Sequence, residues 1–298
     1  MKKTPNIVQA WATAARLRTL PIPTIQVLTG AALAYSITGT MNWSILLYTW
    51  LVAVFITIGT NLINDVIDFD KGENQPKRVG FLKVISAGII SRKNVQLAGL
   101  TSFALALFFG MFLGLHAGWV VFILIVLSVI CGYCYTGGPY PISYLGLSEL
   151  FILVFYGGVC VGAAFYLQTG YLSFAAMLCA LQMGLLAILP NALNNFRDMH
   201  EDVENNKFTL AVRFGKTFAR WELTILTFLP FALGIIWLFL GNVEAALIPL
   251  FLLPMAFLFV KELWAAEPGP LFNRFFALSV LLHFLFGIFL VIGFFLEY

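Results

Sequence analysis

Long apolar stretches recur along the whole chain and are separated by short polar segments. We find nine windows of about 20 apolar residues, the length that an α-helix needs to cross the hydrocarbon core of a bilayer. The windows lie near residues 22–41, 44–64, 95–115, 117–135, 148–168, 172–195, 221–241, 243–263 and 272–296. The pattern predicts an all-α fold, a polytopic transmembrane helical bundle of about nine spans that forms a single domain over residues 1–298.

Composition agrees with a lipid environment and excludes other classes of protein. Of the 298 residues, 61% are hydrophobic and only 10% are charged, whereas soluble globular chains carry about 25% charged residues. A net charge of +3 without a basic stripe is too small to neutralise a run of phosphates, so we expect no nucleic-acid ligand. No protein partner is implied. The cysteines are expected to be buried, inert thiols; they are Cys131, Cys134, Cys160 and Cys179.

The distribution of basic residues predicts the orientation in the membrane. With nine spans, all 17 lysines and arginines fall on one side. Because Lys and Arg concentrate in cytoplasmic loops, we expect a cytoplasmic N-terminus and a C-terminus on the opposite side of a bacterial-type inner membrane. The segment from Pro5 to Leu20, with Arg16 and Arg18 among apolar residues, is expected to lie in the membrane interface as a helix.

Two polar stripes interrupt the apolar pattern, one at the end of the second span and one at the end of the sixth. Within each stripe the polar residues recur at i, i+3 or i+4, and i+7, which places them on one face of a helix. The second and sixth spans point in the same direction, so we expect the stripes to face each other across a cavity at the cytoplasmic surface. The first stripe comprises Asn61, Asn64, Asp65 and Asp68, and the second comprises Asn191, Asn194, Asn195, Asp198 and Asp202.

These stripes favour a metal site over ordinary polar helix ends. A helix C-terminus carries a partial negative charge, so carboxylates there need a compensating cation. Carboxylate and amide oxygens suit Mg²⁺, which commonly binds a phosphate as well. Nearby basic residues would bind that phosphate, which suggests a lipid diphosphate as ligand; they are Lys71, Lys77, Arg78, Lys83, Arg197, Lys207 and Arg213. A cation-coupled transporter is the main alternative, although transporters usually hold such groups near the bilayer midplane.

Four motifs resemble those of the UbiA superfamily of intramembrane prenyltransferases. Its two acidic signatures are matched by Asn64-Asp65-Val-Ile-Asp68 and by Asp198-Met-His-Glu-Asp202. Four stretches are most similar to the branch that prenylates 1,4-dihydroxy-2-naphthoate: 15–21, 64–72, 133–141, and 194–198 continuing to 207–215. The superfamily often has a further acid at the position of Gly72, so either Asp70 or Glu73 is left to complete the first cluster.

The resemblance implies an activity. It is the Mg²⁺-dependent transfer of a polyprenyl group from a polyprenyl diphosphate to 1,4-dihydroxy-2-naphthoate, with loss of CO2, to give demethylmenaquinone. Other aromatic acceptors stay open: 4-hydroxybenzoate, an isomeric dihydroxynaphthoate and homogentisate.

The resemblance also implies roles for individual residues. The expected metal ligands are Asn64, Asp65, Asp68, Asp198 and Asp202. The four acids are expected to be catalytic together with Tyr133 and Tyr135, whose ring faces would shield an allylic cation; the alternative for the tyrosines is an interfacial aromatic belt. The expected substrate-binding residues are Asn61, Asn64, Asn194, Asn195, Lys71, Arg78, Lys83, Arg197, Lys207, Arg18 and Glu149. For Arg78 and Lys83 the alternative is a purely topological role, and for Glu149 it is an interfacial position.

Overall fold

The computed structural model describes residues 6–72 and 83–296, and these residues form a bundle of long helices. Eight helical segments within those ranges are long and apolar enough to cross a membrane, and a ninth apolar helix is shorter. This agrees with the nine predicted windows. Six spans are single helices: α3 (Trp43–Asp70), α4 (Arg92–Ala117), the shorter α5 (Trp119–Cys134), α8 (Phe174–Arg197), α10 (Leu210–Phe239) and α13 (Phe272–Leu296). The other three are composed of consecutive segments. Leu17–Thr38 contains η1 (Leu17–Thr19) and α2 (Pro21–Thr38); Ser148–Thr169 contains α6 (Ser148–Ile152), η3 (Leu153–Val161) and α7 (Gly162–Thr169); Val243–Ala265 contains α11 (Val243–Leu247), η4 (Ile248–Leu252) and α12 (Leu253–Ala265).

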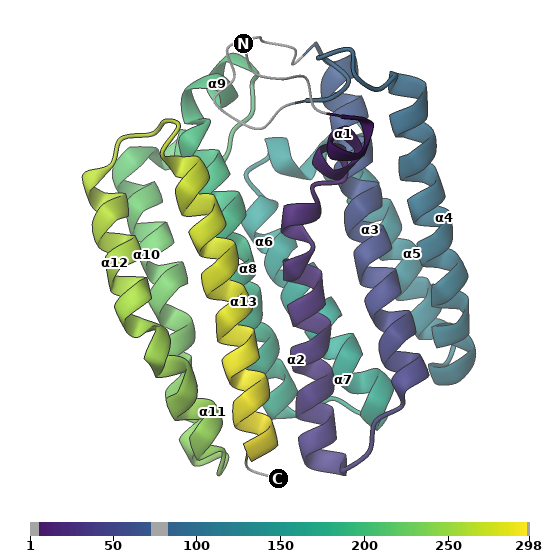
Figure 1. Ribbon diagram of the computed structural model, residues 1–298, viewed down its shortest axis with the longest axis vertical. Coiled ribbons are helices and arrows are strands. Elements are labelled where there is room, and N and C mark those ends of the chain that lie inside the picture. Colours follow the sequence, from purple (N-terminus) through teal and green to yellow (C-terminus); the bar gives the residue numbers. More distant parts are fainter. Residues whose placement is uncertain (1–5, 73–82, 297–298) are drawn as a thin grey trace.

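The spans run side by side, and the two ends of the chain lie at opposite ends of the bundle (Figure 1). This arrangement is the one expected for an odd number of crossings. Two short helices lie at the same end as the N-terminus: α1 (Ile7–Ala14) and α9 (Met199–Glu204). The third short element, η2 (Ile142–Tyr144), follows α5.

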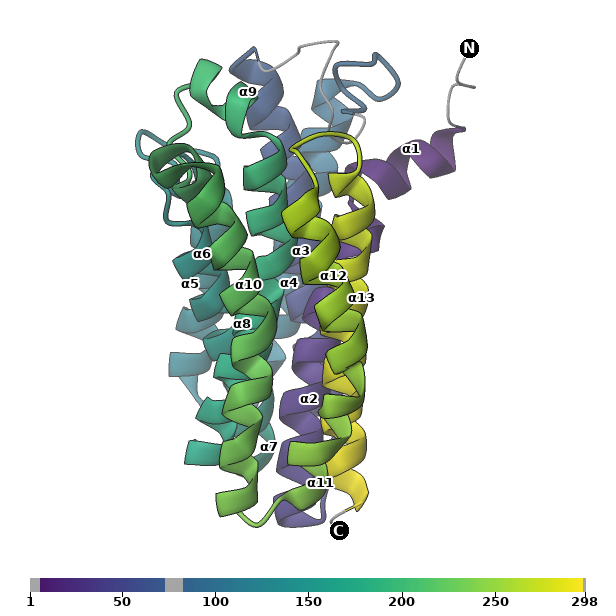
Figure 2. The same cartoon turned by 90° about the vertical axis from the view of Figure 1, so that its left-hand side faces the viewer.

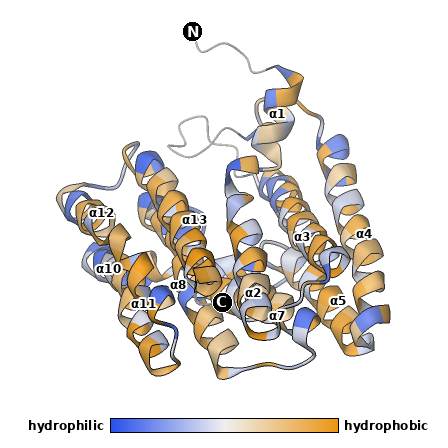
Figure 3. Ribbon diagram, turned by 60° about the horizontal axis from the view of Figure 1, so that its bottom comes forward, coloured by the Kyte–Doolittle hydropathy of each residue, from blue (hydrophilic) through white to orange (hydrophobic). Residues whose placement is uncertain are grey.

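Hydrophobic residues cover the length of the spans, whereas hydrophilic residues gather toward their ends (Figure 3). Large apolar side chains such as Phe239 and Phe251 point outward, with 85% and 79% of their surface exposed. In water such a surface would be unfavourable, but lipid solvates it. Together with the nine apolar helices, this surface marks the chain as an integral multi-pass membrane protein.

Side-chain caps fix where several spans begin. Each capping oxygen accepts a hydrogen bond from a backbone N–H of the first turn, which would otherwise lack a partner. The caps are Asn42 for α3, Ser91 for α4, Ser173 for α8 and Thr209 for α10.

Helix α8 is the most deeply buried of the candidate spans and forms the centre of the main hydrophobic core. It approaches the π-helical segment η3 closely, because glycines face each other at the contact. A Cβ atom on Gly157 would lie 2.5 Å from the carbonyl oxygen of Ala180 and 3.0 Å from the Cα of Gly184. Only glycine therefore permits this spacing, which draws η3 toward α8.

Helix α1 runs across the bundle axis instead of along it (Figure 2). Its N-terminus is fixed by a reciprocal capping box between Asn6 and Gln9. Ala10 and Ala14 are buried against the bundle, whereas Ile7 and Val8 are exposed. The position and the exposed apolar residues are those predicted for an interfacial helix.

Candidate active site

Four asparagines of the two polar stripes line one cavity of about 140 Å³, which we call the polar cavity. Helix α3 contributes Asn61 and Asn64 to its wall, and helix α8 contributes Asn191 and Asn194. In each helix the two asparagines are three residues apart, so they project from the same face. The asparagine ends of the two stripes therefore meet across a cavity, as their spacing predicts. Among the described residues, the wall does not include the four predicted ligand acids, Asp65, Asp68, Asp198 and Asp202.

Two oxygens among these asparagines have no hydrogen-bond partner. Asn64 Oδ1 and Asn194 Oδ1 are both buried and accept no hydrogen bond from any residue that the structure describes. A buried oxygen left in this state is costly, and such atoms commonly mark the place of a ligand or ion. Amide oxygens beside carboxylates are the hard donors that Mg²⁺ prefers, so the chemistry of the donor set fits that ion.

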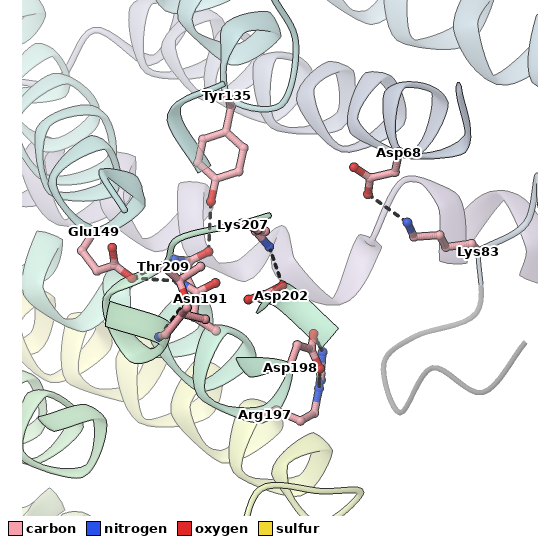
Figure 4. Close-up of polar contacts among 12 residues, drawn as sticks. Asp68, Lys83, Tyr135, Glu149, Asn191, Arg197, Asp198, Asp202, Lys207 and Thr209 are labelled. Carbon is pink, nitrogen blue, oxygen red and sulfur yellow. Dashed lines mark hydrogen bonds and ion pairs between the residues drawn. The ribbon is translucent and has the colours of Figure 1, made fainter. Parts of the chain in front are cut away.

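Each of the four predicted ligand acids makes an ion pair with a basic side chain (Figure 4 shows three of the four). The pairs supply the positive charge that carboxylates at a helix C-terminus require. The N···O distances are 3.0 Å for Arg16–Asp65, 3.1 Å for Lys83–Asp68, 2.6 Å for Arg197–Asp198 and 3.3 Å for Lys207–Asp202.

The acids of the two predicted metal clusters are paired with basic residues and are not gathered around a common point. Within residues 6–72 and 83–296, no three carboxylate, histidine or cysteine side chains converge closely enough to hold one metal ion. Each acid faces its own basic partner instead. Asp70 is exposed and paired with Arg92, and Glu73 lies outside the described residues, so which of these two acids completes the first cluster stays open.

A hydrogen-bonded chain supports the α8 side of the polar cavity (Figure 4). The Tyr135 hydroxyl donates to Asn191 Oδ1 at 3.0 Å, and Asn191 Nδ2 donates to Glu149 Oε1 at 3.4 Å. Asn195 Nδ2 donates to the same carboxylate oxygen at 2.8 Å. Tyr135 and Asn191 are part of the cavity wall, whereas Glu149 is buried behind Asn191. Glu149 thus orients a wall residue.

Asn61 and Arg18 lie on the cavity wall near the N-terminal segment. Asn61 Nδ2 donates to the carbonyl oxygen of Ala15 at 3.3 Å and lies 3.5 Å from Thr19 Oγ1. The guanidinium of Arg18 lies 5.9 Å from the centre of the Phe276 ring. The contacts of Asn61 tie the start of the first span to α3, and the contact of Arg18 ties it to α13.

The sequence predicts three further site residues, Lys71, Tyr133 and Arg78. Lys71 Nζ donates to the carbonyl oxygen of Thr136 at 3.0 Å and sits over the Tyr144 ring. Tyr133 is half-exposed and lines neither cavity described here. Arg78, like Lys77, lies outside the described residues. Roles for these residues in substrate binding or catalysis stay predictions.

A second cavity, of about 460 Å³ and almost entirely apolar, lies between α3, α5 and the segment formed by η3 and α7; we call it the apolar cavity. The two cavities share wall residues, so they adjoin. The shared residues are Thr57, Thr60, Phe151 and Tyr156. The π-helical segment η3 supplies Tyr156, whose hydroxyl lies 3.2 Å from Thr57 Oγ1. A long molecule with a polar head and an apolar tail would fit this pair of cavities.

Comparison with known proteins decides the family. Residues 25–286 match the UbiA prenyltransferase family. The chain belongs to this family. It is 35% identical over 218 residues to the 1,4-dihydroxy-2-naphthoate octaprenyltransferase of Escherichia coli, covering 71% of this chain and 70% of that one. It is 30% identical over 300 residues to the enzyme of the same name from Haemophilus influenzae, covering 96% and 97%.

A solved UbiA homologue has the same fold. The structure from Archaeoglobus fulgidus bound to GPP and Mg²⁺ superposes with a TM-score of 0.63 and 17% identity, covering 95% of this chain and 99% of that chain. Membership of the UbiA prenyltransferase family decides between the enzyme and the transporter in favour of the enzyme.

Sequence reasoning missed several wall residues of this UbiA-family cavity, among them Arg16, Phe151 and Tyr156. Arg16 was assigned only to the interfacial helix, yet it lines the polar cavity and pairs with Asp65. Its proximity to Arg18 in the motif was the available signal. Tyr156 lies in an apolar window where an aromatic residue suggests lipid contact, so nothing in the local pattern distinguished it.

Proposed function

We propose that the chain transfers a polyprenyl group from a polyprenyl diphosphate to 1,4-dihydroxy-2-naphthoate, releasing pyrophosphate and CO2 and forming demethylmenaquinol, the 1,4-diol from which a separate oxidation gives demethylmenaquinone. The observation that carries the proposal is the junction of the asparagine-lined polar cavity with the apolar cavity. A diphosphate head would occupy the first and an isoprenoid tail the second. Two relatives named as 1,4-dihydroxy-2-naphthoate octaprenyltransferases, at 35% and 30% identity, support the choice of acceptor.

The buried amide oxygens of Asn64 and Asn194, with the acids that follow them on α3 and after α8, suit Mg²⁺. Asp65 and Asp68 would hold one ion and Asp198 and Asp202 a second, with Asn64 and Asn194 as auxiliary ligands. Bound Mg²⁺ would stabilise the charge of the departing pyrophosphate. Arg18 and the basic partners of the acids would add positive charge around the same oxygens.

Aromatic side chains at the junction suit the next requirement of the reaction. When the C–O bond of the donor breaks, the pyrophosphate keeps the bonding electrons and an allylic cation is left. Phe151 and Tyr156 belong to both cavities, so they would lie beside that carbon and present ring faces to it. The apolar wall would also keep water from the cation.

The acceptor would approach from the α8 side of the polar cavity. Its electron-rich ring would attack the cation at the carbon that bears the carboxylate, and loss of CO2 would restore aromaticity. Asn191 offers the polar contact for the ring substituents, held in place by Tyr135 and Glu149. The concentration of basic residues at this end of the bundle supports a cytoplasmic site.

Prenyl transfer by the purified full-length protein in detergent tests the proposal. The assay offers 1,4-dihydroxy-2-naphthoate or 4-hydroxybenzoate together with a long-chain polyprenyl diphosphate, with and without Mg²⁺. We expect Mg²⁺-dependent product and released CO2 from the naphthoate alone. Product from 4-hydroxybenzoate alone would replace the acceptor and keep the reaction class, and product without Mg²⁺ would overturn the metal assignment.

Replacement of Gly158 by leucine tests the position of the tail. Gly158 lines the apolar cavity, and a Cβ at this position meets no atom within 4 Å. The added side chain should therefore fit and occupy tail space, lowering kcat/KM for a long-chain donor about tenfold while sparing a short-chain donor. Val154→Leu, at an exposed position one turn earlier, is the matched control. Equal losses for long and short donors would place the tail elsewhere.

A further inference from the structure

The four ion pairs at the candidate site differ in how firmly the basic residue is held. Arg197 places Nε and Nη2 on the two oxygens of Asp198, and its Nη1 donates to Asn273 Oδ1 at 2.8 Å. Its side chain is 3% exposed. Arg16 touches Asp65 through Nη2 alone, and 35% of its side chain is exposed. Of these two arginines, Arg16 is the one free to change its partner.

Arg16 also has a backbone that aims its side chain at the cavity. It adopts the left-handed conformation, with φ 51° and ψ 48°, which is unfavourable for a residue with a Cβ and often marks a functional position. Thr19 stabilises it, since both its backbone N–H and its hydroxyl donate to the Arg16 carbonyl at 2.8 Å. The backbone is thus fixed between α1 and the first span, and a change of partner would involve the side chain alone.

The position of Arg16 connects two candidate ligands. Its side chain is part of the wall of the polar cavity, and its guanidinium lies on Asp65 Oδ1. A divalent cation bound by Asp65 would compete with the guanidinium for that carboxylate. A diphosphate in the polar cavity would attract the guanidinium away from it, because Arg binds phosphate oxygens through paired N–H groups.

We propose that Arg16 exchanges between Asp65 and the diphosphate, so that it weakens cation binding to the substrate-free enzyme and strengthens diphosphate binding. Arg16 is therefore a positioning residue that makes cation and diphosphate bind together. In the free protein it neutralises Asp65, and in the loaded site it neutralises the diphosphate. This inference rests on the proposed function.

Binding measurements on the full chain in detergent test the exchange without turnover. Mn²⁺ alone is titrated by electron paramagnetic resonance, and inorganic pyrophosphate is titrated by calorimetry at saturating Mg²⁺. For Arg16→Gln we expect Mn²⁺ affinity to rise and pyrophosphate affinity to fall, each by roughly fivefold to tenfold at low salt. Arg16→Lys keeps the charge and should restore most of both affinities.

The expected changes in Mn²⁺ affinity and pyrophosphate affinity have opposite signs. This distinguishes the exchange from a structural defect, which would lower both affinities. Arg274→Gln is the matched control, since it removes an arginine from an exposed ion pair with Glu262 and should change neither affinity. If Arg16→Gln lowers both affinities or leaves both unchanged, the exchange is overturned while the proposed function stands. If the wild-type protein binds neither probe, the proposed function fails and the exchange fails with it.

Discussion

The first acidic cluster, on α3, and the second, at the end of α8, achieve charge balance in different ways. In the second cluster the basic partners are close in sequence, because Arg197 precedes Asp198 and Lys207 follows Asp202 by five residues. In the first cluster Asp65 is paired with Arg16, which is 49 residues away in the sequence. The second cluster is a local unit, whereas the first is assembled from separate segments.

This difference suggests that the two clusters have different functions. A buried, bidentate pair such as Arg197–Asp198 holds its geometry because neither group can reach water. A pair that water reaches is weaker and can exchange partners at little cost. We infer that the Arg197–Asp198 pair makes the second cluster the fixed half of the site and that the Arg16–Asp65 pair makes the first cluster the adjustable half. The two lysine pairs do not distinguish the clusters, since the side chains of Lys83 and Lys207 are 11% and 20% exposed.

Removal of one carboxylate charge from either cluster should have the largest effect. We expect Asp68→Asn and Asp198→Asn each to lower kcat at least about 100-fold, because each removes a charge that stabilises the leaving pyrophosphate through Mg²⁺. Prenyl transfer at saturating donor measures the loss, with a cooperative unfolding transition above the assay temperature as the check on folding. Glu262→Gln, at an exposed pair, is the matched control. Near-normal activity in either variant would remove that residue from the metal site.

Removal of the basic partner should lower the free energy of unfolding by different amounts in the two clusters. Arg197→Ala leaves the carboxylate of Asp198 buried without its guanidinium, so we expect the free energy of unfolding to fall by about 3–5 kcal/mol. Arg16→Ala also leaves a buried carboxylate, that of Asp65, but it removes one hydrogen bond from an arginine that is itself partly exposed, so we expect a smaller loss of about 1–3 kcal/mol. Denaturant unfolding in detergent, followed by tryptophan fluorescence, measures both. Equal losses would contradict the division into a fixed and an adjustable cluster.

The comparison also shows what sequence could predict. The nine apolar windows predicted the number of spans, because a helix must satisfy its own backbone hydrogen bonds in lipid. Helical periodicity then placed Asn61 and Asn64 opposite Asn191 and Asn194. These features depend only on local spacing and on the parity of crossings, so one sequence contains them.

The remaining features depend on packing between distant segments. Nothing near Arg16 in the sequence indicates that its guanidinium reaches Asp65, since the contact depends on a left-handed turn after α1. Tyr156 reaches both cavities because η3 is π-helical and lies close to α8 through Gly157 and Gly184. Such contacts are set by tertiary packing, and a periodic pattern does not encode them.

Tyr135 offers the finest test, because its hydroxyl acts on the fixed side of the site while its ring lies in the cavity wall. Tyr135→Phe removes the donor to Asn191 Oδ1, but Asn191 keeps its contact with Glu149. We expect only a threefold to tenfold loss of kcat/KM, roughly the worth of one hydrogen bond. Tyr135→Ala should be much more severe, since it also removes the ring that faces Phe151.

The matched variant on the other wall is Tyr156→Phe, which removes the hydroxyl beside Thr57 of α3. If α3 belongs to the adjustable half, loss of this contact should change activity less than Tyr135→Phe does. Steady-state kinetics with both substrates varied measures kcat and KM for each variant. Equal losses in Tyr135→Phe and Tyr135→Ala would mean that the hydroxyl, and not the ring face, carries the function. In that case the phenol of Tyr135 would act through Asn191 on the acceptor, and shielding of the cation would fall to Phe151 and Tyr156.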